Sequence, residues 1–240
     1  MKRLKLPRLG ARTVKTALCV AICLLLNLLL RDEISLYAAV AAIVCMQSSF
    51  ENTVKTAVDR LVGTGIGGAF VERGSIMLGA HNEAGHIGHV SCTDAAGVPC
   101  QCGATGHLET IACGPGIINR YLELGGDPKD EDGNAVDGAV IDRRAAAGEK
   151  AAIDAEARSG HAIGEVLGSL VNMLDPDCII LSGSVAQCGP AWHDAMAAGW
   201  SEAVMPPCAK TPIVSGNLGG DAPLIGAAEN IVKSAYVEFE

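Results

Sequence analysis

The chain has 240 residues, 29 of them glycine and only 3% aromatic, and its formal net charge is -9. This length allows one or two domains with a substantial core, and the abundance of glycine suits an α/β protein better than a β-sandwich. Residues 1–60 carry nine Lys/Arg and four Asp/Glu, whereas residues 61–240 carry nine Lys/Arg and 23 Asp/Glu. The second part lacks the basic surface that nucleic-acid binding needs, so we expect no nucleic-acid partner. The ten cysteines lack the even spacing of a small secreted disulfide framework, which favours a reducing compartment.

Two uncharged runs follow a basic start of six Lys/Arg and no acidic residue in "MKRLKLPRLGARTVK". The first is Ala17–Leu30, with 14 residues, and the second is Ile34–Phe50, with 17. A membrane helix needs about 20 apolar residues, with about 17 as a short limit. We therefore predict a helical membrane hairpin over residues ~14–50 with its basic ends in the cytoplasm. A signal peptide and a soluble pair of amphipathic helices stay open as alternatives.

The stretches "LGARTVKTALCVAICLLLNLL" and "LYAAVAAIVCMQSSFENTVKTAVDRLVGTGIGG" resemble the start of the bacterial aromatic acid exporter (FUSC-like) family. The resemblance covers about the first 68 residues and implies the first pair of several membrane helices. Two helices cannot enclose a substrate path, so we do not expect transport by this chain. The expected location is the cytoplasmic face of the bacterial inner membrane, with the cytoplasm as the alternative.

A glycine-rich segment begins at Gly63, in "GTGIGGAFVERG". It leads into a β-like run at Ala69–Val71, and "ERG" then predicts a hairpin turn. Glycines before a strand let backbone N–H groups approach a phosphate closely. A plain turn that binds nothing is the alternative.

Metal-binding residue types are concentrated in the next segment, where C-x-C-G-x-x-G-H contains Cys100, Cys102 and His107. His89 lies upstream across the turn "DAAGVP". Two thiolates and two imidazoles favour tetrahedral, structural Zn²⁺. Cys92 or His86 could replace one of the four ligands, and incidental surface groups remain the alternative.

The remaining elements alternate between helix and strand. An acidic segment, residues 125–138, lacks the EF-hand spacing and predicts a solvated loop. A long helix, or two, should then end at Asp175-Pro176. After it the order is strand "CIILSG", helix "GPAWHDAMAAGWSEAVM", strand "TPIVSG" and a last helix "PLIGAAENIVKSAY". This order predicts a mainly parallel sheet with helices on its faces.

Several motifs together resemble the ROK family of sugar kinases and sugar-responsive repressors: "GTGIGG", "NEAGHIGH", "PCQCGATGHLE", "ACGPGI" and "LVNMLDPDCIILSGSVAQCGPAW". The resemblance runs from Gly63 nearly to the C-terminus. It implies an α/β fold in residues 63–240, namely the C-terminal lobe of an actin-like (ribonuclease H-like) sugar kinase with a zinc loop. In this interpretation, residues 1–62 form the preceding α-helical membrane hairpin.

The resemblance also implies roles for individual residues. The zinc set is His89, Cys100, Cys102 and His107, with His107 in place of the family's last cysteine. The sugar contacts are His86, His89 and Glu109, where His86 stands in place of the family's glutamate. Gly63, Thr64 and Gly65 match a phosphate loop, and Gly183 matches the region behind the adenosine. The implied ligands are a hexose or N-acetylhexosamine, ATP and Mg²⁺, and a homo-oligomer stays open.

Two parts of the family's catalytic machinery have no counterpart in the sequence. These are the D-x-G-G-T-K phosphate loop and the catalytic Asp of an N-D-A-N-like segment. Phosphoryl transfer needs such a base and cradle, so we assign no catalytic residue and expect a truncated, impaired kinase region. An exporter fragment and a non-catalytic sugar-binding protein are the rival interpretations. The two resemblances meet at "GTGIGGAF", which indicates recombination between two genes or an artefact of sequence assembly.

Overall fold

The computed structural model describes residues 65–81, 83–218 and 225–226. Thr64–Asn217 form one compact unit, and the description below concerns that unit. The predicted membrane hairpin, together with Gly63 and Thr64, lies outside the described residues. Within the described ranges, no helix combines the length and apolarity that crossing a bilayer requires.

The described unit begins with a small hairpin that confirms the predicted turn. Strand β1, Val71–Glu72, pairs antiparallel with strand β2, Ser75–Ile76. Between them Arg73 and Gly74 have φ angles of 50° and 77°. Positive φ at both central residues gives a turn whose twist matches that of paired strands.

Short helical segments follow the hairpin. Two 3₁₀ helices come first, η1 at Ile87–His89 and η2 at Thr93–Ala95. Two α-helices come next, α4 at Glu109–Ala112 and α5 at Gly114–Glu123. These elements bracket the segment with the predicted zinc ligands.

The acidic loop leads into helix α6, Gly138–Ala146. Within the loop, Asp130 Oδ1 accepts hydrogen bonds from the backbone N–H groups of Asp132 and Asn134, at 2.9 and 2.8 Å. Asp137 caps α6, because its Oδ1 accepts from the N–H of Val140 at 2.8 Å. Such a cap satisfies one of the donors that a helix start leaves unpaired.

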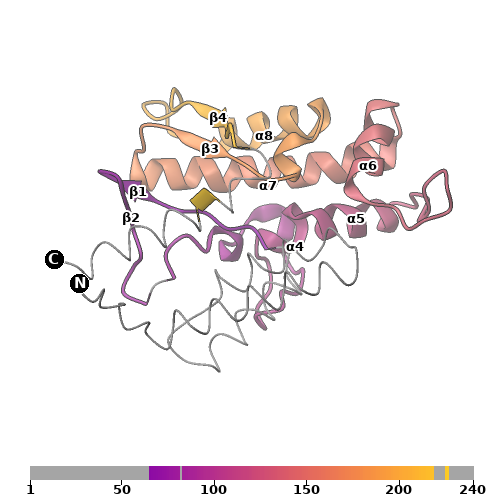
Figure 1. The fold of residues 1–240 in the computed structure, drawn as a ribbon, viewed down its shortest axis with the longest axis horizontal. Helices are drawn as coiled ribbons and strands as arrows, with labels where there is room; N and C mark the ends of the chain where they lie inside the picture. The colour runs from indigo at the N-terminus through magenta and orange to yellow at the C-terminus, as the bar shows by residue number, and fades with distance from the viewer. Residues whose placement is uncertain (1–64, 82, 219–224, 227–240) are drawn as a thin grey trace, which may run out of the picture. The chain divides into compact units, whose positions relative to one another are not determined.

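Helix α7, Lys150–Leu174, is a single helix of 25 residues, which decides between the one or two helices predicted. It ends at Asp175, whose left-handed backbone (φ 43°) cannot continue the helix, and Pro176 follows. Figure 1 shows α7 at the centre of the unit, with α4 and α5 along one side and α8 along the other.

The last elements confirm the predicted alternation. Strand β3, Ile179–Leu181, leads through the 3₁₀ helix η3, Val185–Gln187, to helix α8, Pro190–Ala203. Strand β4, Ile213–Ser215, then pairs with β3 in parallel. The predicted last helix falls almost entirely outside the described residues, where only residues 225–226 are described, as helical.

Helices α7 and α8 approach each other closely because glycines line their contact. A Cβ on Gly160 would clash with the backbone carbonyl oxygen of Trp192, and one on Gly164 with that of Met196. On the other helix, a Cβ on Gly199 would clash with the carbonyl oxygen of His161. The absence of side chains at these positions therefore sets the distance between the helices.

The apolar core next to the candidate site contains Trp192, which is 2% exposed. The indole Nε1 of Trp192 donates to Ser159 Oγ at 3.1 Å, and Ser159 Oγ donates to the carbonyl of Ala112 at 3.1 Å. Leu108 and Ile111 belong to the same buried cluster. This packing places the start of α4, and so Glu109, firmly against α7.

Candidate functional site

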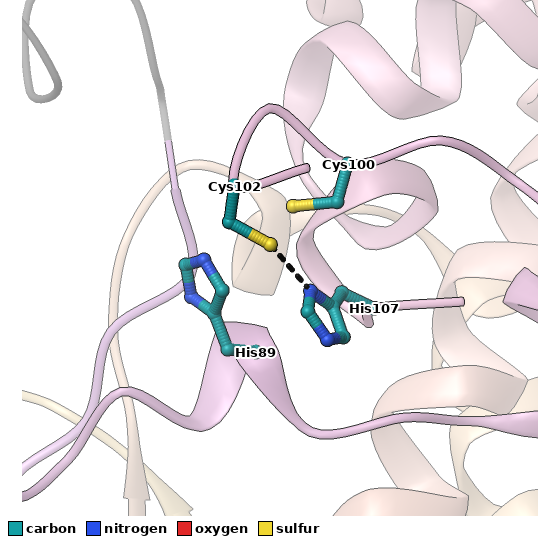
Figure 2. Close-up of side chains that lie close together, drawn as sticks. All are labelled: His89, Cys100, Cys102 and His107. Atoms are coloured by element: carbon teal, nitrogen blue, oxygen red, sulfur yellow. Dashed lines mark hydrogen bonds between the residues drawn. The ribbon is translucent and has the colours of Figure 1, made fainter. Parts of the chain in front are cut away.

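The four predicted zinc ligands converge on one space. Figure 2 shows the thiols of Cys100 and Cys102 and the rings of His89 and His107 pointing toward one another. One ligand atom from each lies within 4.8 Å of all the others, and Cys102 Sγ is 3.3 Å from His107 Nδ1. A tetrahedral zinc site has ligand atoms roughly 3.3–3.8 Å apart, given Zn–S and Zn–N bonds of about 2.3 and 2.0 Å. Small side-chain shifts would bring this cluster to that geometry, so the donor set fits zinc.

The backbone holds these ligands in place through short-range pairing. Ser91 and His107 form an antiparallel bridge, and Leu108 N donates to the carbonyl of Val90 at 2.9 Å. Cys100 N donates to the carbonyl of Ala104 at 2.8 Å and closes the turn that contains Cys102. The ligand segments are thus ordered by their own hydrogen bonds, which is the preorganisation that a metal site needs.

Glu109 lies directly beside the four-ligand cluster. Its Oε1 accepts from the thiol of Cys100 at 3.2 Å and is 3.6 Å from His89 Nε2. Burial first, and then the contact with Glu109, raise the pKa of Cys100 to about 11. A bound divalent cation would displace that thiol proton, because thiolates bind metals and thiols do not. Glu109 can also orient the ring of His89, as carboxylates beside metal-binding histidines do.

His86 lies at the edge of this cluster, with its ring centroid 6.1 Å from that of His89. Its Nδ1 lies 2.8 Å from the backbone carbonyl oxygen of Glu83 and 3.3 Å from the Glu83 carboxylate. Both partners are acceptors, so they favour the tautomer with the proton on Nδ1, in which Nε2 is an acceptor. The sequence interpretation did not single out Glu83, although its position three residues before His86 was a signal for this contact.

The glycine-rich segment lies against the H-I-G-H motif. Gly88 N donates to the carbonyl of Ile66 at 3.1 Å, and Gly68 N donates to that of Gly85 at 2.8 Å. A Cβ on Gly88 would clash with the carbonyl oxygen of Ile66. Glycine is therefore required for this close approach, which brings the two predicted ligand segments together.

A cavity of about 1060 Å³ opens beside these segments. Gly65, predicted for the phosphate loop, and Gly183, predicted for the adenosine region, both line it. Ile87 and Gly114 line it as well, so it reaches the H-I-G-H motif and the start of α5. Gly63 and Thr64, predicted for the same phosphate loop, are outside the described residues.

Cys92, considered above as a substitute zinc ligand, belongs to the apolar core instead. Its residue is 7% exposed, and burial raises the pKa of its thiol. The four-residue ligand group contains neither Cys92 nor His86. The geometry therefore favours the set that uses His89 and His107.

A second cluster of polar side chains, which the sequence did not predict, connects η2 to helices α7 and α8. His161 Nδ1 is 2.6 Å from Asp94 Oδ2, and its Nε2 is 3.2 Å from Glu202 Oε2. The Asp94 contact raises the pKa of His161, against the opposing effect of burial. Glu165 accepts from both the N–H and the hydroxyl of Thr93, at 3.0 and 2.6 Å. These contacts hold η2, within the segment that carries the four predicted zinc ligands, on helices α7 and α8.

The sequence is similar to curated sugar kinases. A glucokinase from Halalkalibacterium halodurans is 35% identical over 136 residues, or 53% of this chain and 41% of that protein. An N-acetylmannosamine kinase from Escherichia coli O157:H7 is 33% identical over 153 residues, or 63% of this chain and 49% of that protein. The chain spans about half the length of the curated relatives it matches.

A solved structure supports the α/β kinase-like fold. The ROK family glucokinase from Streptomyces griseus, in complex with glucose and AMPPNP, is similar with a TM-score of 0.58 and 25% sequence identity. The likeness covers 70% of this chain and 57% of that chain. The sugar kinase resemblance of the C-terminal part is therefore confirmed at the level of fold.

The family model described as "ROK family" matches residues 37–234. Its match begins upstream of Gly63 and includes residues 37–62, which were predicted above to belong to the membrane hairpin. That hairpin and its exporter-like resemblance stay predictions. Since the model covers well over half of the sequence, the chain belongs to the ROK family.

Proposed function

We propose that this chain is a sugar-binding region of a ROK-type kinase that takes a hexose or N-acetylhexosamine. The observation that carries the proposal is that His86 and Glu109 both lie next to His89, which belongs to the four-ligand cluster. His89 Nε2 is 3.6 Å from Glu109 Oε1, and the His86 and His89 rings are 6.1 Å apart. The matched relatives include a glucokinase and an N-acetylmannosamine kinase, which supports this substrate class.

The proposed binding mode follows from hydrogen-bonding capacity. An ionised carboxylate only accepts hydrogen bonds, so Glu109 can hold sugar hydroxyl protons. His86 offers one acceptor, Nε2, where the glutamate expected from the family would offer two oxygens. The nearby Glu83 carboxylate, 3.3 Å from His86 Nδ1, favours that tautomer. A preference among sugars that differs from the relatives follows from this single acceptor.

Zinc is the proposed structural metal, held by His89, Cys100, Cys102 and His107. Their ligand atoms lie within 4.8 Å of one another, and two thiols with two imidazoles suit Zn²⁺. When bound, the ion would keep the loop rigid and hold His89 in place, while the neighbouring Glu109 remains available to the sugar.

The proposed nucleotide region is the cavity lined by Gly65 and Gly183. Glycine N–H groups can donate to phosphate oxygens there, and the related glucokinase holds AMPPNP in its solved structure. The sequence contains no D-x-G-G-T-K loop and no N-D-A-N-like segment. We therefore propose that the chain binds sugar and does not itself transfer phosphate from ATP with Mg²⁺.

Sugar binding is tested by calorimetry on the full chain with glucose and N-acetylmannosamine. We expect binding of at least one sugar, and at least about 10-fold weaker binding in Glu109→Gln, because a lost charged hydrogen bond costs about 1.5–3 kcal/mol. Glu123→Gln is the matched control, since Glu123 lies on α5 and pairs with Arg120 at 3.1 Å. Binding that is equal in the wild type and Glu109→Gln, or absent for both sugars, contradicts the proposal.

A further inference from the structure

A second group of metal-binding residue types, with one buried and two half-buried members, lies outside residues 85–110. Asp142 on α6, Glu156 on α7 and Cys188 just after η3 each place one ligand atom within 4.8 Å of the other two. None of the motifs discussed above contains Asp142 or Glu156. Figure 1 shows α6 beside one end of the α7–α8 pair.

Glu156 is the unusual member of this group. The residue is 1% exposed, and among the described residues its carboxylate oxygens make no hydrogen bond of ordinary geometry, although Asp142 and Cys188 lie near enough to interact with them. Isolated buried carboxylates are strongly disfavoured, so they become protonated, pair with a cation or coordinate a metal. The other two members of the group, Asp142 and Cys188, carry no positive charge either. The group therefore lacks positive charge of its own.

The surroundings hold the three ligands in a defined arrangement. Asp142 Oδ1 accepts from the N–H of Gly189 at 2.7 Å, which positions the carboxylate and leaves it a second oxygen. Ile141 is fully buried, and Val185 packs against both apolar clusters of the core. An apolar shell of this kind limits the access of bulk water to a metal site.

We propose that Asp142, Glu156 and Cys188 form a second binding site for a divalent transition-metal ion of the zinc class, which joins α6, α7 and the start of α8. Two carboxylate oxygens and one thiolate are accepted Zn²⁺ ligands, and a water molecule can complete a tetrahedral shell. Binding releases the thiol proton of Cys188 and any proton on Glu156 to the solvent, and no bond in the protein changes otherwise.

The test is metal stoichiometry of the full chain after equilibrium dialysis against Zn²⁺, measured by atomic emission. Relative to the wild type, Glu156→Gln and Cys188→Ala should each lose one bound ion per chain. Cys178→Ala is the matched control and should lose none, because Cys178 is exposed and outside both ligand groups. The difference of one ion is expected whether or not the loop site binds zinc, so this test is independent of the proposed function.

A second readout uses Co²⁺ in the Cys100→Ala/Cys102→Ala background, which removes both loop thiols. A thiolate-to-Co²⁺ absorption band should remain there and disappear when Cys188→Ala is added. Equal zinc content in the wild type and Glu156→Gln, with no such band, would falsify the proposal and identify Glu156 as a buried, protonated acid. Cys188→Ala decides the question if Glu156→Gln fails to fold.

Discussion

The ligand loop, residues 85–110, and the α7–α8 pair organise polar groups in opposite ways. In the loop, four ligand residues lie close together in the sequence and are held near the surface by short-range backbone bonds. Around α7, the interacting residues are distant in sequence and are held by close packing through Gly160, Gly164 and Gly199. We therefore expect the structure of the loop to depend on its four predicted metal ligands. The packing of α7 against α8 should instead depend on glycine, which has no side chain, at the contact positions.

The largest expected effect is a loss of zinc affinity when one predicted ligand of the loop is removed, and it should leave the helix pair unchanged. Cys102→Ala should weaken zinc binding at the loop site by at least about 100-fold, because a closed four-ligand site loses one bond. The α7–α8 pair should keep its helical circular dichroism. The matched control is Cys178→Ala, whose exposed thiol lies outside the loop. Loss of helix signal in Cys102→Ala would show that the regions are not independent.

The next largest effect is a loss of stability when the packing of α7 against α8 is disturbed and the predicted loop ligands are left in place. Gly164→Ala puts a Cβ against the carbonyl oxygen of Met196, so we expect a loss of about 1–3 kcal/mol from the free energy of unfolding. Gly138→Ala is the control, because a Cβ at the first residue of α6 meets no atom within 4 Å. Chemical denaturation measures both. Equal stability of the two variants would contradict the close approach of α7 and α8.

The smallest effect concerns the contact between the two regions at His161. The pKa of His161 is raised, first by the hydrogen bond with Asp94. A raised histidine pKa adds stability that is fully present below the unfolded value of about 6.5 and is lost as the pH rises through the higher folded value. The wild type should therefore lose more stability than His161→Gln between pH 6 and pH 9, by about 0.2–1 kcal/mol for a partly exposed pair.

Thermal unfolding at several pH values measures this difference. The groups that contact His161 are acidic, namely Asp94 from η2 and Glu202 from α8, with Glu165 one turn away on α7. One cation is also near, because Arg158, one turn before His161, donates to the backbone carbonyl oxygen of Asp94 at 2.6 Å. Glu202→Gln should shrink the difference less than Asp94→Asn, because the Asp94 contact is shorter and less exposed. Identical pH profiles for the wild type and His161→Gln would show that this contact contributes nothing.

The sequence predicted the local features and missed the long-range ones. The convergence of His89, Cys100, Cys102 and His107 was predictable because they form one short pattern, while their binding of zinc stays a prediction. The segment "ERG" was sufficient for the hairpin turn. The neighbours of Glu156 were not predictable, since Asp142 and Cys188 come from other elements and only the tertiary fold brings them together. Within "AIDAEARSGH", helical periodicity alone could not show that Glu156 is buried while its neighbour Asp154 pairs with Lys150 on the surface.

The glycines of α7 also have a consequence for the order of folding. Gly160, Gly164 and Gly168 lie inside a single helix, and each lowers intrinsic helix stability by about 1 kcal/mol relative to alanine. A segment with this composition gains little from helix formation alone, so most of its stability comes from docking against a partner. We therefore expect the second half of α7 to form together with α8, as one cooperative unit whose amide hydrogens exchange with solvent in the same opening event.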